Sequence, residues 1–374
     1  MRILGIETSC DETSAAVVQE TGDAAKPWTI RSNVIASQVP IHREWGGVVP
    51  ELASRQHIRD ICGVVERALD EAATSLGDLG AIAVTQGPGL VGSLLIGVSF
   101  AKATAAASGL PLVAVHHLAG HIESLVLQNG EMPLPAVVLV VSGGHTSLYL
   151  VEQPGRYRLL SRTRDDAAGE AYDKVAKLLG LGYPGGPVID RLAQRGDDRA
   201  VQLPTTRLTH ADRNAPELKG DLDFSFSGLK TAVLRYVRSH PPSGGGSGFS
   251  PREIADVAAS FQRIVVTVLI ERLFDAARRY EAKSVGIAGG VSANSRLRAE
   301  LQARGAAREL PTFLPSLQLS TDNAAPFAMD GHLRSDDVGA DRPRLRGVAS
   351  FFDDGGGCFV AGSLDTENAH LSPD

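Results

Sequence analysis

The stretch that decides the fold is residues 113–149, VAVHHLAGHIESLVLQNGEMPLPAVVLVVSGGHTSLY. It places two chemically distinctive elements next to each other. The first is His117-x-x-x-His121, because histidines four residues apart lie on one face of a helix, close enough to share a metal ion. The second is an apolar run, 136–141, that ends in Ser-Gly-Gly at 142–144, where bare backbone N–H groups can cradle a phosphate. Metal and phosphate sites in adjacent elements indicate one centre that handles a nucleotide.

The bulk composition predicts an intracellular globular protein. A chain of 374 residues with 43% hydrophobic content can form two domains with real cores. It has no run of eighteen apolar residues, so we expect no membrane segment. The N-terminus, MRILGIETSC, lacks the features of a secretory signal. Three cysteines at unrelated spacings fit a reducing cytosol and exclude a disulfide framework.

The net charge of −6 does not indicate a nucleic-acid binder as a whole. Three stretches are nevertheless locally basic, namely 156–164, 296–308 and 342–346. Such patches can hold RNA, and ordinary solvated faces look the same. Charge alone leaves both readings open.

Hydrophobic periodicity predicts alternating strands and helices. We expect strands at 2–7, 15–18, 81–85, 111–115, 136–141, 146–151 and 284–288, and helices at 51–73, 91–107, 167–180, 188–195, 251–280 and 295–304. The strand–turn–strand at 136–151 repeats the arrangement at the N-terminus, which indicates two related lobes. Gly185-Gly186, between two prolines, is typical of a rigid exposed loop. Thr321-Asp322-Asn323 is typical of a helix start, and residues 240–250 of a loop insertion.

The individual motifs have competing interpretations. The histidine pair favours a metal over a structural role, but not a zinc peptidase, because Leu118 stands where H-E-x-x-H needs its glutamate. The inverted H-x-x-E-H pattern fails too, since Gly120 precedes His121, and Glu123 lies off the shared face. The hydroxyl-rich turn 8–14 is either a phosphate contact or an ordinary hairpin turn. Two carboxylates near the second Gly-Gly element are either ribose or cation contacts or surface groups: Asp173 and Asp190.

Nine blocks together resemble one family closely. In chain order they are ILGIETSCDET, GGVVPELASRQH, GPGLVGSLL, HHLAGH, VSGGHTSL, DDAAGEAYDKVAKLLGLGYPGG, DFSFSGLK, AGGVSAN and STDNAA. The order is that of the tRNA threonylcarbamoyladenosine transferase family (TsaD, once called Gcp or O-sialoglycoprotein endopeptidase), and the resemblance runs from residue 1 to about 347. It implies an α/β fold of the ASKHA (actin/hexokinase/Hsp70-like) class, with two related lobes around a nucleotide cleft. We assign the first lobe to 1–132 with a return at 322–347, the second to 133–321, and a disordered tail to 353–374.

The resemblance also implies a reaction and its residues. The threonylcarbamoyl group of threonylcarbamoyl-adenylate moves to N6 of adenosine-37 in tRNAs that read ANN codons, and AMP leaves. By matching position, the metal ligands are His117, His121 and Asp322, and the metal is a divalent ion, Fe²⁺ with Zn²⁺ as the alternative. The implied substrate contacts are Val140, Val141, Ser142, Gly143, Gly144, Asp173, Gly186, Asp190 and Asn294. The implied catalytic residues lining the same cleft are Asp11, Glu12 and His145. Our hypothesis is that Asp11, in preference to Glu12, helps to remove the N6 proton.

The partners implied are tRNA, a smaller TsaB-like paralogue, a TsaE-like ATPase and a TsaC-like adenylate synthase, in the cytoplasm and away from membranes. The chain departs from the family at Pro326-Phe327, where an apolar helix start is usual, and in longer segments at 205–222, 243–248 and from 353. Two rival functions remain, a metallopeptidase and a non-catalytic ASKHA subunit. The missing glutamate beside His117 argues against the first, and the histidine pair itself argues against the second.

Overall fold

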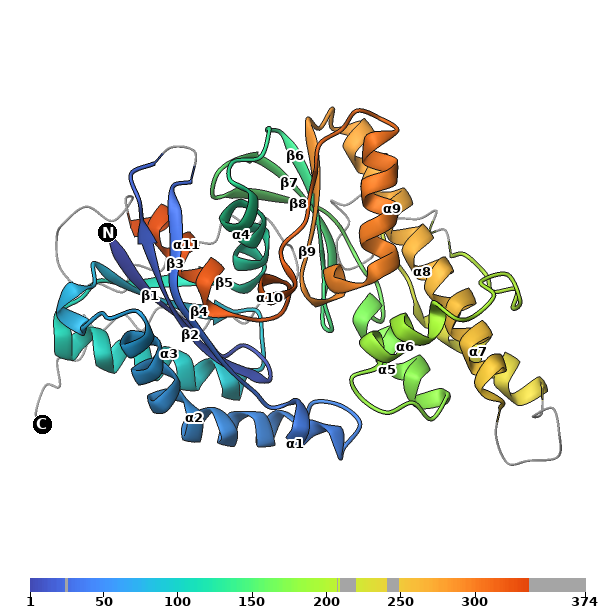
Figure 1. The fold of residues 1–374 in the computed structure, drawn as a ribbon, viewed down its shortest axis with the longest axis horizontal. Coiled ribbons are helices and arrows are strands. Elements are labelled where there is room, and N and C mark those ends of the chain that lie inside the picture. The colour runs from blue at the N-terminus through green and yellow to red at the C-terminus, as the bar shows by residue number, and fades with distance from the viewer. Residues whose placement is uncertain (24–25, 207, 209–219, 241–248, 336–374) are drawn as a thin grey trace, which may run out of the picture.

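The computed structural model describes residues 1–23, 26–206, 208, 220–240 and 249–335. Within them the chain forms two five-stranded sheets, one in each half of the molecule (Figure 1). The first has the order β3-β2-β1-β4-β5, built from β1 (Arg2–Glu7), β2 (Glu12–Glu20), β3 (Trp28–Ser37), β4 (Ala81–Gly87) and β5 (Leu112–His116). The second has the order β10-β9-β6-β7-β8, built from β6 (Ala136–Val141), β7 (Thr146–Gln153), β8 (Arg156–Arg162), β9 (Ser284–Ala288) and β10 (Thr312–Phe313).

The two sheets share one topology. Strand β1 pairs antiparallel with β2, and β2 with β3, while β4 and β5 continue the sheet in parallel on the other side. The second sheet repeats this, with β6, β7 and β8 antiparallel and β9 and β10 parallel. The expectation of two related lobes of the ASKHA class is therefore confirmed.

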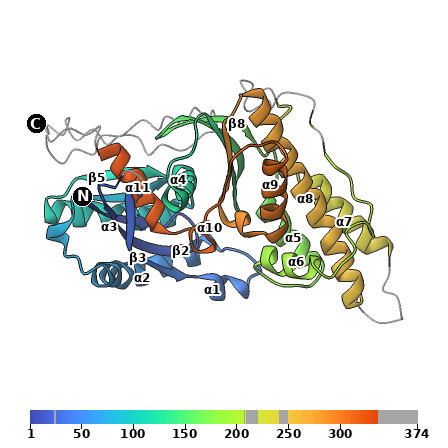
Figure 2. The same ribbon diagram turned by 45° about the horizontal axis from the view of Figure 1, so that its top comes forward.

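Helices cover both faces of each sheet (Figures 1 and 2). The helices of the first half are α1 (Val39–Arg43), α2 (Pro50–Glu71), α3 (Val91–Ser108) and α4 (His117–Asn129), with a short 3₁₀ turn, η1 (Leu76–Asp78). The rest are α5 (Ala168–Leu178), α6 (Gly185–Ala193), α7 (Ser227–Ser239), α8 (Pro251–Arg279), η2 (Gly290–Ala293), α9 (Ser295–Ala306), α10 (Leu317–Ser320) and α11 (Ala324–Ser335).

Strand β6 shows why its sequence is apolar at every position. Val137, Leu139 and Val141 face one core, which contains the apolar side of α8. The alternate residues of the strand face a second core, which contains the apolar side of α4. Because successive side chains of a strand point to opposite faces, a strand covered on both sides reads as a continuous apolar run.

Helix α11 returns to the first half of the molecule. Its Phe327 and Ala328 share a core with Ile3 and Ala83 of the first sheet. The approach is close, since a Cβ added to Gly5 of β1 would lie 2.4 Å from the carbonyl oxygen of Ala324. Helix α4 in turn lies between the sheets, in contact with α11, β6 and β9. This arrangement supports the predicted C-terminal return as far as residue 335, and the lobe boundaries stay a prediction.

The expected strands and helices are all present, with small shifts at their ends. The prediction of an exposed loop at Gly185-Gly186 is wrong: both residues lie in the first turn of α6, and Gly185 is buried. Pro187 is tolerated there because the first N–H groups of a helix have no partner within it. The sequence analysis missed β3, β8, β10, α1, α7, α10 and the two short 3₁₀ turns. Most of the longer segment expected at 205–222 lies outside the described residues, as do the expected insertion at 243–248, the last part of the predicted return, 336–347, and the predicted tail, 353–374.

By length and composition alone, α3 is apolar enough to cross a membrane, which the sequence analysis did not anticipate. One such helix is weak support for a membrane segment. Ser93, Gly97 and Ala101 of α3 are buried, and the helix packs against β4 and α2.

Candidate metal centre and cleft

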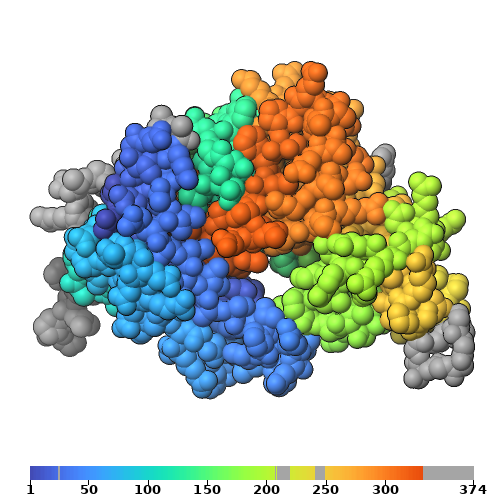
Figure 3. All heavy atoms as spheres, in the orientation of Figure 1, coloured from blue at the N-terminus to red at the C-terminus, as the bar shows by residue number. Residues whose placement is uncertain are grey.

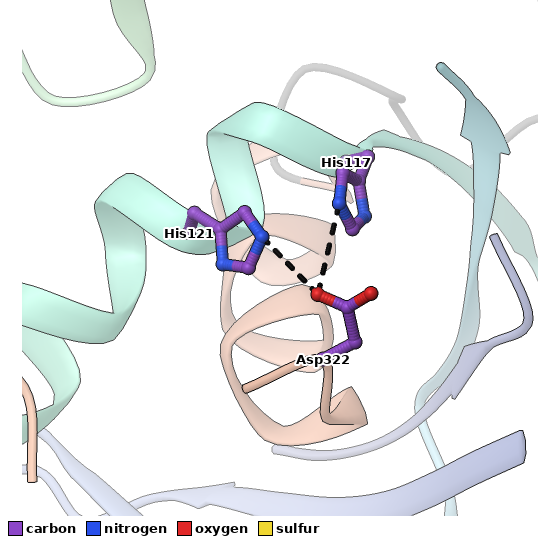
Figure 4. A group of neighbouring side chains, drawn as sticks. All are labelled: His117, His121 and Asp322. Carbon is purple, nitrogen blue, oxygen red and sulfur yellow. Dashed lines mark ion pairs between the residues drawn. The ribbon is translucent and has the colours of Figure 1, made fainter. Parts of the chain in front are cut away.

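Three side chains converge where α4 meets α11 (Figure 4). His117 and His121 project from α4, with ring centroids 4.6 Å apart and ring planes at 75°. Asp322 lies just before α11, and its Oδ1 is 3.3 Å from Nε2 of His121 and 3.8 Å from Nε2 of His117. The structure thus brings together all three residues that we expected to bind a metal.

Local hydrogen bonds fix the starts of α4 and α11, the two helices that position these side chains. His116 ends β5, and its Nδ1 accepts a hydrogen bond from the N–H of Leu118, which starts α4 directly after the strand. The N–H of Ala324 donates to Ser14 Oγ of β2 at 2.9 Å, which anchors the start of α11 on the first sheet. The predicted helix start at 321–323 is confirmed, and Pro326 sits within the first turn of α11 without interrupting it.

Phe327 forms the wall behind the histidines. Its ring is buried and stacks on His117, with centroids 5.7 Å apart and planes at 28°. It fits because α4 has no side chain at Gly120: an added Cβ there would lie 2.5 Å from the Phe327 ring. The unusual Pro326-Phe327 pair therefore leaves the centre intact and packs against it.

Ser9, from the hydroxyl-rich turn 8–14, and Glu7, which the sequence analysis did not single out, hold the far side of the His117 ring. Ser9 Oγ lies 3.1 Å from Nδ1 of His117, and the fully buried Glu7 places Oε2 at 3.5 Å. Glu7 also accepts hydrogen bonds from the Ser9 N–H and from the Thr85 hydroxyl. These contacts hold the Nδ1 side of the His117 ring and turn Nε2 toward Asp322, where a bound metal ion would replace the Nε2 proton.

The centre favours positive charge. Burial opposes ionisation of His117, but Asp322 and Glu7 outweigh it and raise the pKa of His117 to about 9. Burial likewise opposes a charged Asp322, yet His117 and His121 outweigh it and lower the pKa of that carboxyl. A pocket that stabilises a proton so strongly will also attract a metal cation.

The donor set fits a metal ion. His121 Nε2 is buried and makes no hydrogen bond to any described residue. The three donor atoms lie within 4.8 Å of one another. A metal with bonds of roughly 2.0–2.2 Å to nitrogen and oxygen holds its ligands at most about 4 Å apart, so small rotations would close the site. Three protein ligands also leave coordination positions open.

The Gly-Gly turn after β6 lies beside this centre. The His145 N–H donates to Ser142 Oγ at 3.2 Å, and the His145 ring lies 6.1 Å from that of His117. Gly143 and Gly144 are exposed, and within the described chain neither N–H donates a hydrogen bond to protein. These two N–H groups are available to an oxyanion. The side chains of the two strand residues before the turn, Val140 and Val141, are fully buried in the cores.

His145 itself is held neutral. Burial, together with His117 and His121, lowers its pKa to about 3. A neutral imidazole can donate through one nitrogen and accept through the other.

Two adjacent carboxylates follow β1 in the first lobe. The side chain of Asp11 is largely buried, and its backbone carbonyl accepts from the Gln38 N–H at 3.0 Å. Glu12 accepts a hydrogen bond from Ser37 Oγ at 3.2 Å. Burial and the neighbouring Asp11 raise the pKa of Glu12 well above its usual value. Glu12 therefore favours its protonated form.

The remaining predicted contacts line the second lobe. Asp173 accepts the Gly185 N–H at 2.7 Å, and burial, with a smaller contribution from Asp11, raises its pKa. The charge of Asp11 in the first lobe therefore acts on Asp173 in the second. Gly186 has open space around it. Asp190 and Asn294 are both engaged at the start of α9: Asp190 accepts from the Ser295 N–H and hydroxyl, and Asn294 Oδ1 accepts from the Leu297 N–H.

Gln262, which the sequence analysis did not identify, links these last two residues. Its amide donates to Asp190 Oδ1 at 3.0 Å, and its Oε1 accepts from Asn294 Nδ2 at 2.8 Å. Asp190 and Asn294 thus belong to one partly buried polar network on the second lobe. Nothing in the local sequence around Gln262, inside a long helix, separates it from an ordinary helix residue.

Comparison with known proteins gives a consistent result. A family model described as TsaD: tRNA N6-adenosine threonylcarbamoyltransferase matches residues 29–329. A relative named tRNA N6-adenosine threonylcarbamoyltransferase from Anaeromyxobacter sp. (strain Fw109-5) is 51% identical over 346 residues, covering 91% of this chain and 97% of the relative. One from Koribacter versatilis (strain Ellin345), with the same name, is 47% identical over 362 residues, covering 89% and 93%. The crystal structure of T. kodakarensis HypF matches with a TM-score of 0.57 at 13% identity, over 89% of this chain and 48% of that one, which bears on the fold alone.

Proposed function

Because the chain belongs to the tRNA N6-adenosine threonylcarbamoyltransferase family, we propose that its cleft moves a threonylcarbamoyl group from threonylcarbamoyl-adenylate to N6 of adenosine-37 in tRNAs reading ANN codons. One observation carries the placement of this reaction. The buried triad His117, His121 and Asp322 lies beside the Gly143–Gly144 turn, linked to it through His145. A metal centre and an oxyanion cradle side by side suit an acyl adenylate.

The triad would hold one divalent metal, and Fe²⁺ is our proposal with Zn²⁺ as the alternative. Two imidazoles and one carboxylate with open positions are the ligand set typical of non-haem iron, and zinc also accepts them. When bound, the metal supplies a Lewis acid beside the reacting group. Glu7 and Ser9 keep the Nε2 of His117 turned toward it.

The chemical step depends more on positioning the two substrates than on activating them, because the adenylate is already an activated mixed anhydride. The N6 amine attacks the carbamoyl carbon, the bond from that carbon to the phosphate oxygen breaks, and AMP departs with the electron pair. Negative charge then grows on the AMP phosphate. The free N–H groups of Gly143 and Gly144 would donate to it.

A base must take the proton that N6 loses, and we assign it to Asp11. The raised pKa of Glu12 favours its protonated form, so Glu12 is the poorer acceptor of the N6 proton. Asp11→Ala should therefore lower turnover at saturating substrate by about 10²–10⁴-fold. Full turnover in that variant would reject Asp11 as the base.

The second lobe would hold the adenosine of the adenylate. Asp173 and Asp190 present carboxylate oxygens on that side of the cleft, and Asn294 stiffens Asp190 through Gln262. Carboxylates suit ribose hydroxyls, which need acceptors. We propose that Val140, Val141 and Gly186 contact the adenylate through their backbone only. The side chains of the two valines are buried in the cores, and Gly186 has none.

The reaction also requires partners. We propose a cytoplasmic protein that works with a TsaB-like paralogue, a TsaE-like ATPase and a TsaC-like enzyme that makes the adenylate. The two rival functions are less well supported. A metallopeptidase would need a carboxylate base next to His117, where Leu118 stands, and a non-catalytic subunit would have no use for a buried metal triad.

The test is reconstitution. Purified chain is incubated with its three partners, ATP, threonine, bicarbonate and unmodified tRNA, and the digested nucleosides are analysed by mass spectrometry. We expect threonylcarbamoyladenosine at position 37 only when this chain is present. Its absence, with active partners and a folded, metal-loaded chain, would favour the non-catalytic subunit, and cleavage of added glycoprotein would favour the peptidase.

A further inference from the structure

One large aromatic side chain stands exposed on the first lobe. Trp45 lies between α1 and α2 and is 63% exposed, although a tryptophan normally gains stability by burial. It follows Arg43 and Glu44 and precedes the pair Gly46-Gly47. None of the functions assigned above uses it.

The loop that presents Trp45 is well ordered by its own hydrogen bonds. The fully buried His42 closes it, with Nε2 3.2 Å from Gln38 Oε1 and Nδ1 accepting from the Val49 N–H at 3.3 Å. The N–H groups of Trp45 and Gly47 both donate to the His42 carbonyl. Trp45 is therefore exposed on a loop whose conformation is fixed by hydrogen bonds, and folding does not depend on burying its ring.

The loop is connected to the proposed catalytic residue Asp11 by a backbone hydrogen bond. The Gln38 N–H donates to the carbonyl of Asp11, our proposed base, at 3.0 Å. Helix α5 of the second lobe lies across from α1 (Figure 1). The two meet closely, because a Cβ built on Gly46 would lie 3.7 Å from Nζ of the exposed Lys177. Figure 3 shows the surface hollowed between these parts of the two lobes.

The chemistry at this rim matches single-stranded RNA. Proteins read unpaired RNA bases by stacking them on aromatic faces, next to cations that meet the backbone phosphates. A base whose amine is to be modified must also leave its stack to enter a deep site. The loop offers the exposed aromatic ring of Trp45. The charges of Arg43 and Glu44 cancel, so the loop adds no net positive charge, and the cation comes from Lys177 on α5.

We propose that Trp45 stacks on an unpaired base of the tRNA substrate while Lys177 contacts a backbone phosphate. This proposal rests on the proposed function and adds a substrate contact to it. A protein partner is a different occupant, and it is less favoured here. The broad exposed apolar face of the first lobe lies elsewhere, on α2 and α3, where Ile58, Val91 and Leu95 are 60–77% exposed.

The first experiment separates binding from chemistry. In the reconstituted reaction, Trp45→Ala should raise the KM for tRNA about tenfold and leave kcat at saturating tRNA nearly unchanged. Trp45→Phe keeps an aromatic face and should stay within about threefold of the wild type, whereas Trp45→Leu keeps only apolarity and should behave like alanine. Leucine restoring the wild-type KM would overturn the proposal.

The lysine has a matched control. Lys177→Ala should raise the KM for tRNA and reduce its dependence on salt, since one phosphate contact is lost. Lys102, also an exposed lysine on a helix but on α3, should tolerate alanine with no change. Equal effects of the two substitutions would reject a specific contact.

The second experiment observes Trp45 directly. The chain has two tryptophans, Trp28 and Trp45, so Trp28→Phe expressed with 5-hydroxytryptophan makes position 45 the one indole that can be excited apart from the tryptophans of the partners. In the complete assembly, its fluorescence should be quenched by an unmodified anticodon stem-loop and not by AMP. If the wild type makes product but this signal does not respond to RNA, the stacking proposal fails and the proposed function stands. If Trp45→Ala instead loses a protein partner and keeps its affinity for RNA, the loop is a protein interface.

Discussion

Replacing Gly120 with alanine tests whether the contact between α4 and α11 positions the metal centre. In a helix interior, alanine is favoured over glycine by up to about 1 kcal/mol. At Gly120 the added methyl would instead lie 2.5–2.8 Å from three carbons of the Phe327 ring. That ring is buried and stacked on His117, so it can move away only by disturbing the centre.

The expected magnitude follows from these opposing terms. Forcing an extra methyl into a packed core costs about 1–3 kcal/mol, so Gly120→Ala should be destabilised by about 0–2 kcal/mol after the gain in helix propensity. Gly63 is the matched control, because it lies within α2 and an added Cβ there has nothing within 4 Å. Gly63→Ala should be stabilised by about 0.5–1 kcal/mol.

Urea unfolding of both variants, with metal removed, measures this difference. Metal affinity, measured by competition with a chelator, should fall in Gly120→Ala and stay unchanged in Gly63→Ala. The double variant Gly120→Ala/Phe327→Leu should recover part of both losses, because the smaller side chain makes room. If Gly120→Ala is stabilised like Gly63→Ala and binds metal normally, the ring does not support the centre and our reasoning is wrong.

Three further predictions follow from the site. Glu7→Gln should weaken metal binding about 10–100-fold while the chain stays folded, since it removes the carboxylate behind His117; unchanged affinity in chelator titrations would contradict this. Burial lowers the pKa of His57 in the folded chain below the ordinary value of 6.5. The free energy of unfolding should therefore fall as the pH drops below 6.5 toward the lowered pKa, by at most about 1.4 kcal/mol per pH unit. In His57→Gln, the midpoint of urea unfolding should change less between pH 7 and pH 5. Removing metal with a chelator should abolish product and leave circular dichroism at 25 °C unchanged, and a collapse of the spectrum would instead make the metal structural.

Much of the fold could be predicted because its strands are buried. Runs such as 136–141 are apolar at every position, and their ends are marked by glycine or polar residues. Strand β3 escaped prediction because it is an edge strand that mixes exposed and buried positions without regular alternation. Gly185-Gly186 misled us because glycine and proline usually break helices, and only the fold places Asp173 where it can accept the first N–H of α6.

The site was predictable only where its residues are close in sequence. His117 and His121 follow from helical spacing, and the turn at 142–144 from its glycines. Asp322 is about 200 residues from the pair, so only the family resemblance brought it in. Glu7 and Gln262 could not be found from sequence, because their importance comes from partners that only the folded chain brings near them.

The most direct test of our central claim measures metal and product on the same samples. Wild type, His121→Ala and Asp322→Asn are purified together, their bound iron and zinc are quantified, and each is assayed for threonylcarbamoyladenosine with the partners and unmodified tRNA. We predict about one metal ion per wild-type chain, and loss of both metal and product in the two folded variants. A folded variant that has lost its metal and still forms product at the wild-type rate would contradict the claim that this centre carries the reaction.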